Sequence, residues 1–217
     1  TVGMLVLLVA ILFSLIKLPD IRSENGAKTN SSPFRLFQNK TVRSAVIAQF
    51  FYVGAQVCIS SFFIRFASKT AGFEQKTASQ WLAAALLLFM IGRFLGTFFM
   101  QYVKPSKLLT IYAIACVLFT FSAITIGGKT SIYCLIAVEF FMSIMFPTIF
   151  SMGVQGLGED AKLGSSLIIM AIVGGAILPL IMGRLSDATS IQTAYFVPLV
   201  GFVFVALFGF SKMRSVQ

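Results

Sequence analysis

Apolar stretches of membrane-spanning length dominate the 217-residue sequence. A helix that crosses a bilayer needs about 20 apolar residues, and six stretches approach or exceed that length, at residues 44–66, 80–102, 108–126, 131–154, 163–182 and 192–210. Only 11% of the residues are charged, whereas a soluble domain carries about 25%. A small soluble core cannot bury so many apolar runs. The sequence therefore predicts an all-α fold, a polytopic transmembrane helical bundle.

Basic residues concentrate in the polar segment at residues 17–43. This segment contains six Lys or Arg residues and only two acidic residues. Loops with such an excess face the cytoplasm, and alternation of the spans then places the C-terminus on the cytoplasmic side too. In a soluble protein the net charge of +10 would favour nucleic acid. Here the charge lies mainly between apolar spans, so we expect the lipid bilayer as a partner and no nucleic acid.

The order of the segments predicts one half of a two-bundle protein. The first apolar span, at residues 2–16, is short for a complete crossing, and the chain begins with Thr1 rather than Met. Many secondary transporters are built from internal repeats of transmembrane helices. We interpret residues 1–17 as the last helix of a missing N-terminal bundle, 18–43 as a cytoplasmic linker, 44–212 as a C-terminal six-helix transmembrane bundle and 213–217 as a cytoplasmic tail.

Polar side chains form one stripe along the span at residues 44–66. Gln49, Tyr52, Gln56 and Ser60 follow spacings of three, four and four, which place them on a single helix face. Polar groups within a bilayer need partners because water is absent there. One interpretation is that the stripe bonds to a neighbouring helix. The other is that it lines a water-filled cavity and binds a hydroxylated ligand such as a sugar, since an amide both donates and accepts hydrogen bonds.

Glu139 is the one acidic residue deep within an apolar span. A carboxylate at that depth is costly, and such residues are candidates for function. Ser143 and Phe146 share its helix face, and Pro147 removes a backbone hydrogen bond and bends the helix. Glu139 is expected to bind a sugar hydroxyl or to take part in proton coupling. The alternative is a structural glutamate that faces a neighbouring helix.

A small-residue pair and an arginine end the third span, in "FMIGRFLGTFF". Gly92 and Gly96 form a G-x-x-x-G pair, which allows close approach of another helix. Arg93 lies about two turns before the end of the span. It is expected either to extend toward the membrane interface or to pair with an acidic residue as a gate.

Enzymatic and metal-binding functions find no support in the sequence. The chain has no His, and its three cysteines (Cys58, Cys116 and Cys134) are far apart, so we expect no metal site. No nucleophile stands with a candidate base, and no carboxylates pair within the spans. We therefore expect no enzyme activity.

Four blocks of the sequence, in order, resemble the L-fucose:proton symporter family of the major facilitator superfamily, which includes fucose, glucose and galactose permeases. They are "QFFYVGAQVCISSFFIRF", "IGRFLGT", "FMSIMFPTIFSMGVQGLGEDAKLGSS" and "GGAILPLIMGRLSDATS". The resemblance covers nearly the whole chain. It implies a major-facilitator-type fold of two bundles around a sugar cavity, with this chain as the C-terminal half. It also implies alternating access in a bacterial inner membrane, with protons as the coupling ion and no cofactor.

The resemblance further implies the sugar-facing positions Gln49, Tyr52, Gln56, Phe89 and Phe146. The chain departs from the fucose branch, which has tyrosine at Phe146 and glutamine at Met145; "SIMFPTIF" is closer to the glucose/galactose branch. The coupling carboxylates of the family lie in the half that is absent here. A role for Glu139 therefore depends on its depth and spacing alone.

The leading hypothesis is the C-terminal half of a proton-coupled symporter that imports L-fucose or a related hexose such as glucose or galactose. One alternative is a facilitator or antiporter of another polar solute, because a fold does not determine a substrate. The other is a membrane subunit that packs without transporting.

Overall fold

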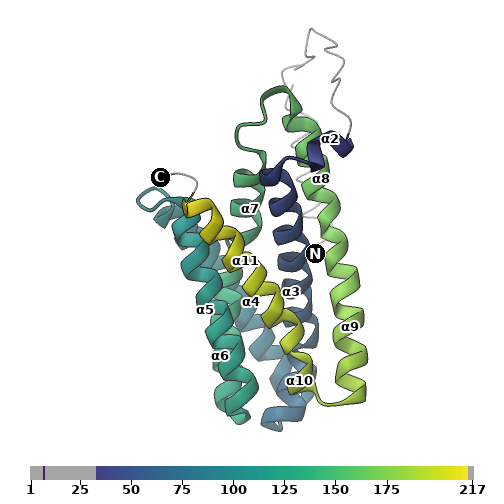
Figure 1. Cartoon of the computed structure of the whole chain (residues 1–217). Helices are drawn as coiled ribbons and strands as arrows, with labels where there is room; N and C mark the ends of the chain where they lie inside the picture. Colours follow the sequence, from purple (N-terminus) through teal and green to yellow (C-terminus); the bar gives the residue numbers. More distant parts are fainter. Residues whose placement is uncertain (1–6, 8–32, 215–217) are drawn as a thin grey trace. The chain divides into compact units, whose positions relative to one another are not determined.

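The computed structural model describes residue 7 and residues 33–214 of the chain, and residues 33–214 contain helices and no strand (Figure 1). The helices are α2 (Pro33–Phe37), α3 (Lys40–Ala71), α4 (Gln75–Phe99), α5 (Pro105–Ile126), α6 (Gly128–Met142), α7 (Met145–Val154), η1 (Gly158–Asp160), α8 (Ala161–Met170), η2 (Ala171–Val173), α9 (Gly174–Ala188), α10 (Ile191–Ala194) and α11 (Phe196–Arg214). The description below concerns the unit formed by residues 31–217.

Six helical segments of the described chain are long and apolar enough to cross a membrane. Three are the single helices α3, α4 and α5. The other three are α6 with α7 (Gly128–Val154), η1 through α9 (Gly158–Ala188), and α10 with α11 (Ile191–Arg214). The predicted all-α transmembrane bundle is confirmed, and the chain is a multi-pass membrane protein.

Helix α3 extends beyond its apolar section at both ends. At its start the side chain of Asn39 accepts a hydrogen bond from the backbone N–H of Thr41 at 2.9 Å, which satisfies one of the free donors of a helix N-terminus. At its end Gly72 adopts a left-handed conformation with φ of 68°, which glycine allows at little cost. The helix therefore continues well past the expected span of residues 44–66.

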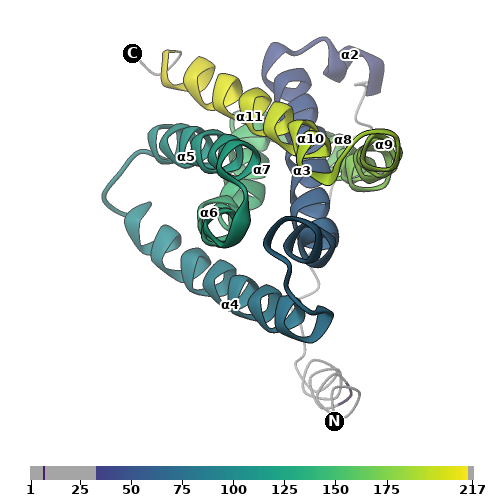
Figure 2. The ribbon, with the colours of Figure 1, turned by 90° about the horizontal axis from the view of Figure 1, so that it is seen from below.

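Helix α3 is the centre of the six-helix unit. It contacts α4, α6, α7, α9 and α11, and Figure 2 shows it between the group α5–α7 and the pair α8–α9. Glycines allow the closest of these approaches. A Cβ atom on Gly174 would collide with the backbone carbonyl of Phe50, and one on Gly201 would lie 2.8 Å from the carbonyl of Phe51. Any side chain at either position would push α9 or α11 away from α3.

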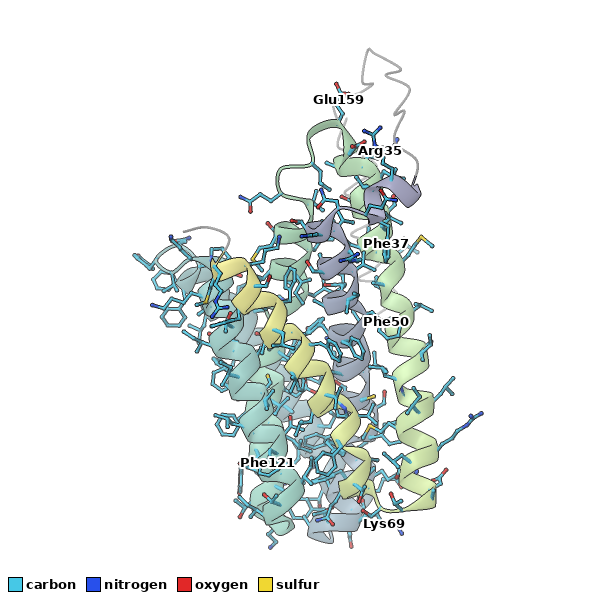
Figure 3. All side chains as sticks on the ribbon, viewed as in Figure 1. Arg35, Phe37, Phe50, Lys69, Phe121 and Glu159 are labelled. Carbon is cyan, nitrogen blue, oxygen red and sulfur yellow. The ribbon has the colours of Figure 1, made fainter. Side chains whose placement is uncertain are left out.

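Large apolar side chains cover the outer surface of the unit. Phe94 on α4 is 72% exposed. Phe121 on α5, labelled in Figure 3, is 51% exposed. Exposed apolar patches of this extent mark contact with a membrane or another protein surface. Polar and charged residues gather at the ends, with Arg35 and Glu159 at one end and Lys69 at the other (Figure 3).

Parts of the predicted domain organisation lie outside the described residues. These are the expected first helix at residues 1–17, apart from residue 7, the expected linker from residue 18 to 32, and residues 215–217 of the expected tail. The described end of the expected linker contains α2 and the first turn of α3.

Candidate functional site

The polar stripe of α3 faces the interrupted helix formed by α6 and α7. Gln49 and Tyr52 are fully buried, whereas Gln56 and Ser60 are half-buried. The burial follows from the central place of α3, because a stripe on this helix meets protein before it meets lipid.

The helix is interrupted between α6, which ends at Met142, and α7, which begins at Met145, although Ser143 and Ile144 keep right-handed helical dihedral angles. Pro147 explains the interruption, since it has no backbone N–H to donate to the carbonyl four residues earlier, that of Ser143. The side chain of Arg93 on α4 supplies the missing hydrogen-bond donors. Its Nε donates to the Ser143 carbonyl at 3.2 Å and its Nη2 at 3.1 Å, while its guanidinium lies 5.2 Å from the ring centroid of Phe89.

Tyr52 of α3 reaches the same interruption from the other side. Its hydroxyl donates to the backbone carbonyl of Met142 at 2.8 Å. The rings of Tyr52 and Phe146 meet edge to face, with centroids 6.4 Å apart. Side chains from α3 and α4 therefore hold two consecutive carbonyls that the helix itself does not satisfy.

Glu139 lies one turn before the interruption and is fully buried. Its Oε1 accepts a hydrogen bond from the hydroxyl of Ser60 on α3 at 2.8 Å, whereas its Oε2 has no hydrogen-bond partner within the described chain. A buried carboxyl group with one unbonded oxygen is costly. The second oxygen is therefore covered by protein and has no hydrogen-bond partner among the described residues.

Two further buried polar groups near the interruption are without partners in residues 33–214. Neither the amide oxygen nor the amide nitrogen of Gln49 makes a hydrogen bond, and the hydroxyl of Ser143 makes none. Buried polar groups in folded proteins are nearly always hydrogen-bonded. Donors and acceptors on α3 and on the α6–α7 segment thus lack partners within the described residues, as do the hydroxyls of Thr70, Thr120, Ser186 and Tyr195 elsewhere in the unit.

The structure combines most of the predicted site residues into one group. Contacts between side chains, or from a side chain to the backbone, join Tyr52 to Phe146 and Arg93 to Ser143. Phe89 joins through Arg93. Gln56 makes no hydrogen bond within the described residues, so its assignment to the site remains a prediction. The interhelical hydrogen bonds of Tyr52 and Ser60 agree with the interpretation that the stripe packs α3 against a neighbouring helix. The unpartnered amide of Gln49 and Oε2 of Glu139 favour the interpretation that the stripe binds a ligand.

Two contacts of the site were not predicted from the sequence: that of Ser60 with Glu139, and that of Arg93 with the Ser143 carbonyl. The first contact joins residues 79 positions apart, and no sequence pattern links them. For the contact between Arg93 and Ser143, the sequence does contain a local indication. Pro147 stands four residues after Ser143, which marks the carbonyl of Ser143 as unsatisfied.

Two cavities are present elsewhere in the unit. One, of about 910 Å³, includes Thr41, Lys104 and Lys212 in its lining, and the other, of about 380 Å³, is apolar and includes Phe50 and Met170. Neither is lined by the polar stripe. No group of three or more potential metal-ligating side chains occurs within the described residues.

Comparison with known proteins identifies similar transporters. No family model matches the chain. The L-fucose-proton symporter of Escherichia coli is 39% identical over 222 residues, covering 97% of this chain and 49% of the relative. The glucose/galactose transporter of Brucella abortus is 34% identical over 208 residues, covering 95% of this chain and 50% of the relative.

The fold is also similar to a solved structure. A crystal structure of a major facilitator superfamily transporter, FucP, in the outward conformation superposes with a TM-score of 0.84 at 38% identity, covering 94% of this chain and 51% of that chain. The chain therefore spans about half the length of the proteins that it matches.

Proposed function

Because the chain belongs to the L-fucose:proton symporter family of the major facilitator superfamily, we propose that it is the C-terminal half of a proton-coupled sugar symporter. The whole protein imports L-fucose or a related hexose, glucose or galactose, by alternating access. The observation that carries the proposal is the set of buried polar groups without hydrogen-bond partners on α3 and α6–α7, namely the Gln49 amide, the Ser143 hydroxyl and Oε2 of Glu139. The names of the similar transporters supply the substrate class.

The polar stripe supplies one wall of the proposed sugar cavity. The half-buried amide of Gln56 bonds to sugar hydroxyls, since an amide offers both a donor group and an acceptor. The amide of Gln49 is fully buried in this structure, so it reaches the sugar only after α3 moves relative to its neighbours during alternating access. The ring of Phe146 and the ring of Phe89 contact the apolar face of the sugar. The missing N-terminal bundle supplies the opposite wall.

Glu139 has two candidate roles in this proposal. Its unbonded Oε2 accepts a hydrogen bond from a sugar hydroxyl, or it carries a proton during the transport cycle. The bond to Ser60 fixes the orientation of the carboxyl group in either case. Protons are the coupling ion, and we propose no other cofactor and no enzymatic activity.

We place the protein in a bacterial inner membrane with its C-terminus in the cytoplasm. The end of the bundle that carries Arg35 also carries the last turn of α11, with Lys212 and Arg214. Basic residues near the ends of spans favour the cytoplasmic side.

Uptake by the full-length transporter in membrane vesicles tests the proposal. Radiolabelled L-fucose, galactose and glucose are offered with and without an inward proton gradient. We expect at least one sugar to accumulate with the gradient and to stop accumulating when a protonophore is added. Uptake that is unchanged by the proton gradient and by the protonophore would indicate a facilitator. The absence of uptake for all three sugars would indicate another substrate class.

A further inference from the structure

The guanidinium of Arg93 replaces a backbone hydrogen bond that proline has removed. Two of its N–H groups, on Nε and Nη2, donate to one oxygen, the carbonyl of Ser143. A helical residue at position 147 would normally donate to that oxygen. Arginine suits this task because its planar fork directs two donors at once, which a lysine ammonium group does not.

Helix α4 is fitted closely against the interruption, which places Arg93 correctly. A Cβ atom on Gly92 would lie 2.6 Å from the carbonyl oxygen of Phe140 and 2.8 Å from the hydroxyl of Ser143. A Cβ atom on Gly96 would collide with the side chain of Ile144. The G-x-x-x-G face thus packs on the interrupted segment itself, and Arg93 lies between the two glycines in sequence.

The interruption separates two groups of the candidate site. Glu139 belongs to α6, before it, and Phe146 belongs to α7, after it. The direction of α7 relative to α6 therefore determines where the Phe146 ring lies relative to the Glu139 carboxyl group. Among the described residues, the hydrogen bonds to the two consecutive carbonyls come from side chains, with Tyr52 on Met142 and Arg93 on Ser143.

We propose that Arg93 is a positioning residue for sugar binding. By bonding to the Ser143 carbonyl it fixes α7 against α6, and so places Phe146 and Glu139 for one ligand. This role rests on the proposed sugar site, although the bond to Ser143 does not. It differs from a role in which Arg93 touches the sugar or pairs with an acidic residue of the missing bundle.

A rescue experiment in the full-length transporter separates these roles. The variants are Arg93→Met, Pro147→Ala and the double variant, with Arg65→Met as the matched control. Arg65 pairs with Asp187 at 2.7 Å between α3 and α9, and no hydrogen bond joins it to α6 or α7 within the described residues. Two quantities are measured in detergent: the Kd for labelled sugar, and amide hydrogen exchange of peptides covering residues 143–150.

We expect Arg93→Met to raise the sugar Kd about tenfold, since a hydrogen bond to a charged group is lost, and to speed exchange in residues 143–150. Pro147→Ala restores an N–H that can donate to Ser143. The double variant should therefore return to within about threefold of the original Kd and should regain slow exchange. Arg65→Met should change neither quantity.

Other results would overturn the inference. If the Arg93→Met effect on Kd is not rescued and exchange is unchanged, Arg93 acts directly on the sugar or on the missing bundle. If no variant or parent protein binds sugar, the proposed function fails, but the exchange data still decide whether Arg93 holds the interruption. If Arg93→Met does not accumulate, Arg93→Lys replaces it, with a smaller loss and the same expected rescue by Pro147→Ala.

Discussion

Arg93 and Ser143 lie 50 residues apart in sequence, yet the guanidinium of one bonds twice to the backbone carbonyl of the other. Pro147 creates the need for this bond and α4 supplies it. The two alternatives drawn from the sequence were extension to the interface and pairing with an acid. The observed partner of Arg93 is neither of these. It is the backbone carbonyl of Ser143, which receives no backbone hydrogen bond from Pro147 because proline has no N–H.

Removing the Tyr52 hydroxyl should destabilise the protein. Tyr52→Phe leaves the buried carbonyl of Met142 without its 2.8 Å partner, which costs about 1–3 kcal/mol of unfolding free energy. The measurement is the thermal unfolding midpoint in detergent. Tyr133→Phe is the control, because Tyr133 is 59% exposed and should leave the midpoint unchanged. Equal midpoints for both variants would mean that the hydroxyl of Tyr52 contributes nothing to the interruption.

Gln56→Ala should weaken sugar binding by about 1–3 kcal/mol, because sugar hydroxyls lose a buried partner. Equilibrium binding of labelled sugar to the full-length transporter provides the measurement. Gln101→Ala serves as the control, since Gln101 is exposed in the connection between α4 and α5. Unchanged affinity in Gln56→Ala would return Gln56 to a packing role on α3.

Glu139→Gln separates the two roles of the carboxyl group. Glutamine retains an acceptor for the hydroxyl of Ser60 but does not bind and release a proton. If Glu139 carries the coupled proton, gradient-driven accumulation should fall at least about tenfold, while exchange of internal for external sugar continues. Glu159→Gln, at an exposed site in η1, should behave as the parent protein. Full accumulation by Glu139→Gln would exclude the proton role and leave binding of a sugar hydroxyl.

The membrane bundle could be predicted from the sequence because apolar runs of this length occur in proteins mainly as transmembrane helices. The true length of α3 could not. Hydropathy reports the part of a helix that matches the hydrocarbon thickness, whereas α3 continues from Lys40 to Ala71 through charged residues such as Arg43 and Lys69. Helix length and membrane thickness are different quantities, and only the second is visible in a hydropathy pattern.

The candidate site was predictable within one helix but not between helices. Spacing alone placed Gln49, Tyr52 and Gln56 on one face of α3. The contacts of that face depend on how α3 packs in the bundle, and one sequence does not contain this information. The bond between Ser60 and Glu139 is therefore a result of the structure.

Labelling of a cysteine at position 56 tests most directly whether the α3 stripe is a wall of a sugar cavity. Cys58, Cys116 and Cys134 are first replaced by serine or alanine in the full-length transporter, and Gln56→Cys is then exposed to a membrane-impermeant maleimide. Ala55→Cys, at a fully buried position, is the matched control. We predict that position 56 reacts, that position 55 does not, and that the transported sugar slows the reaction at 56. A cysteine at 56 that stays unlabelled, or that reacts equally fast with saturating sugar, would contradict the account.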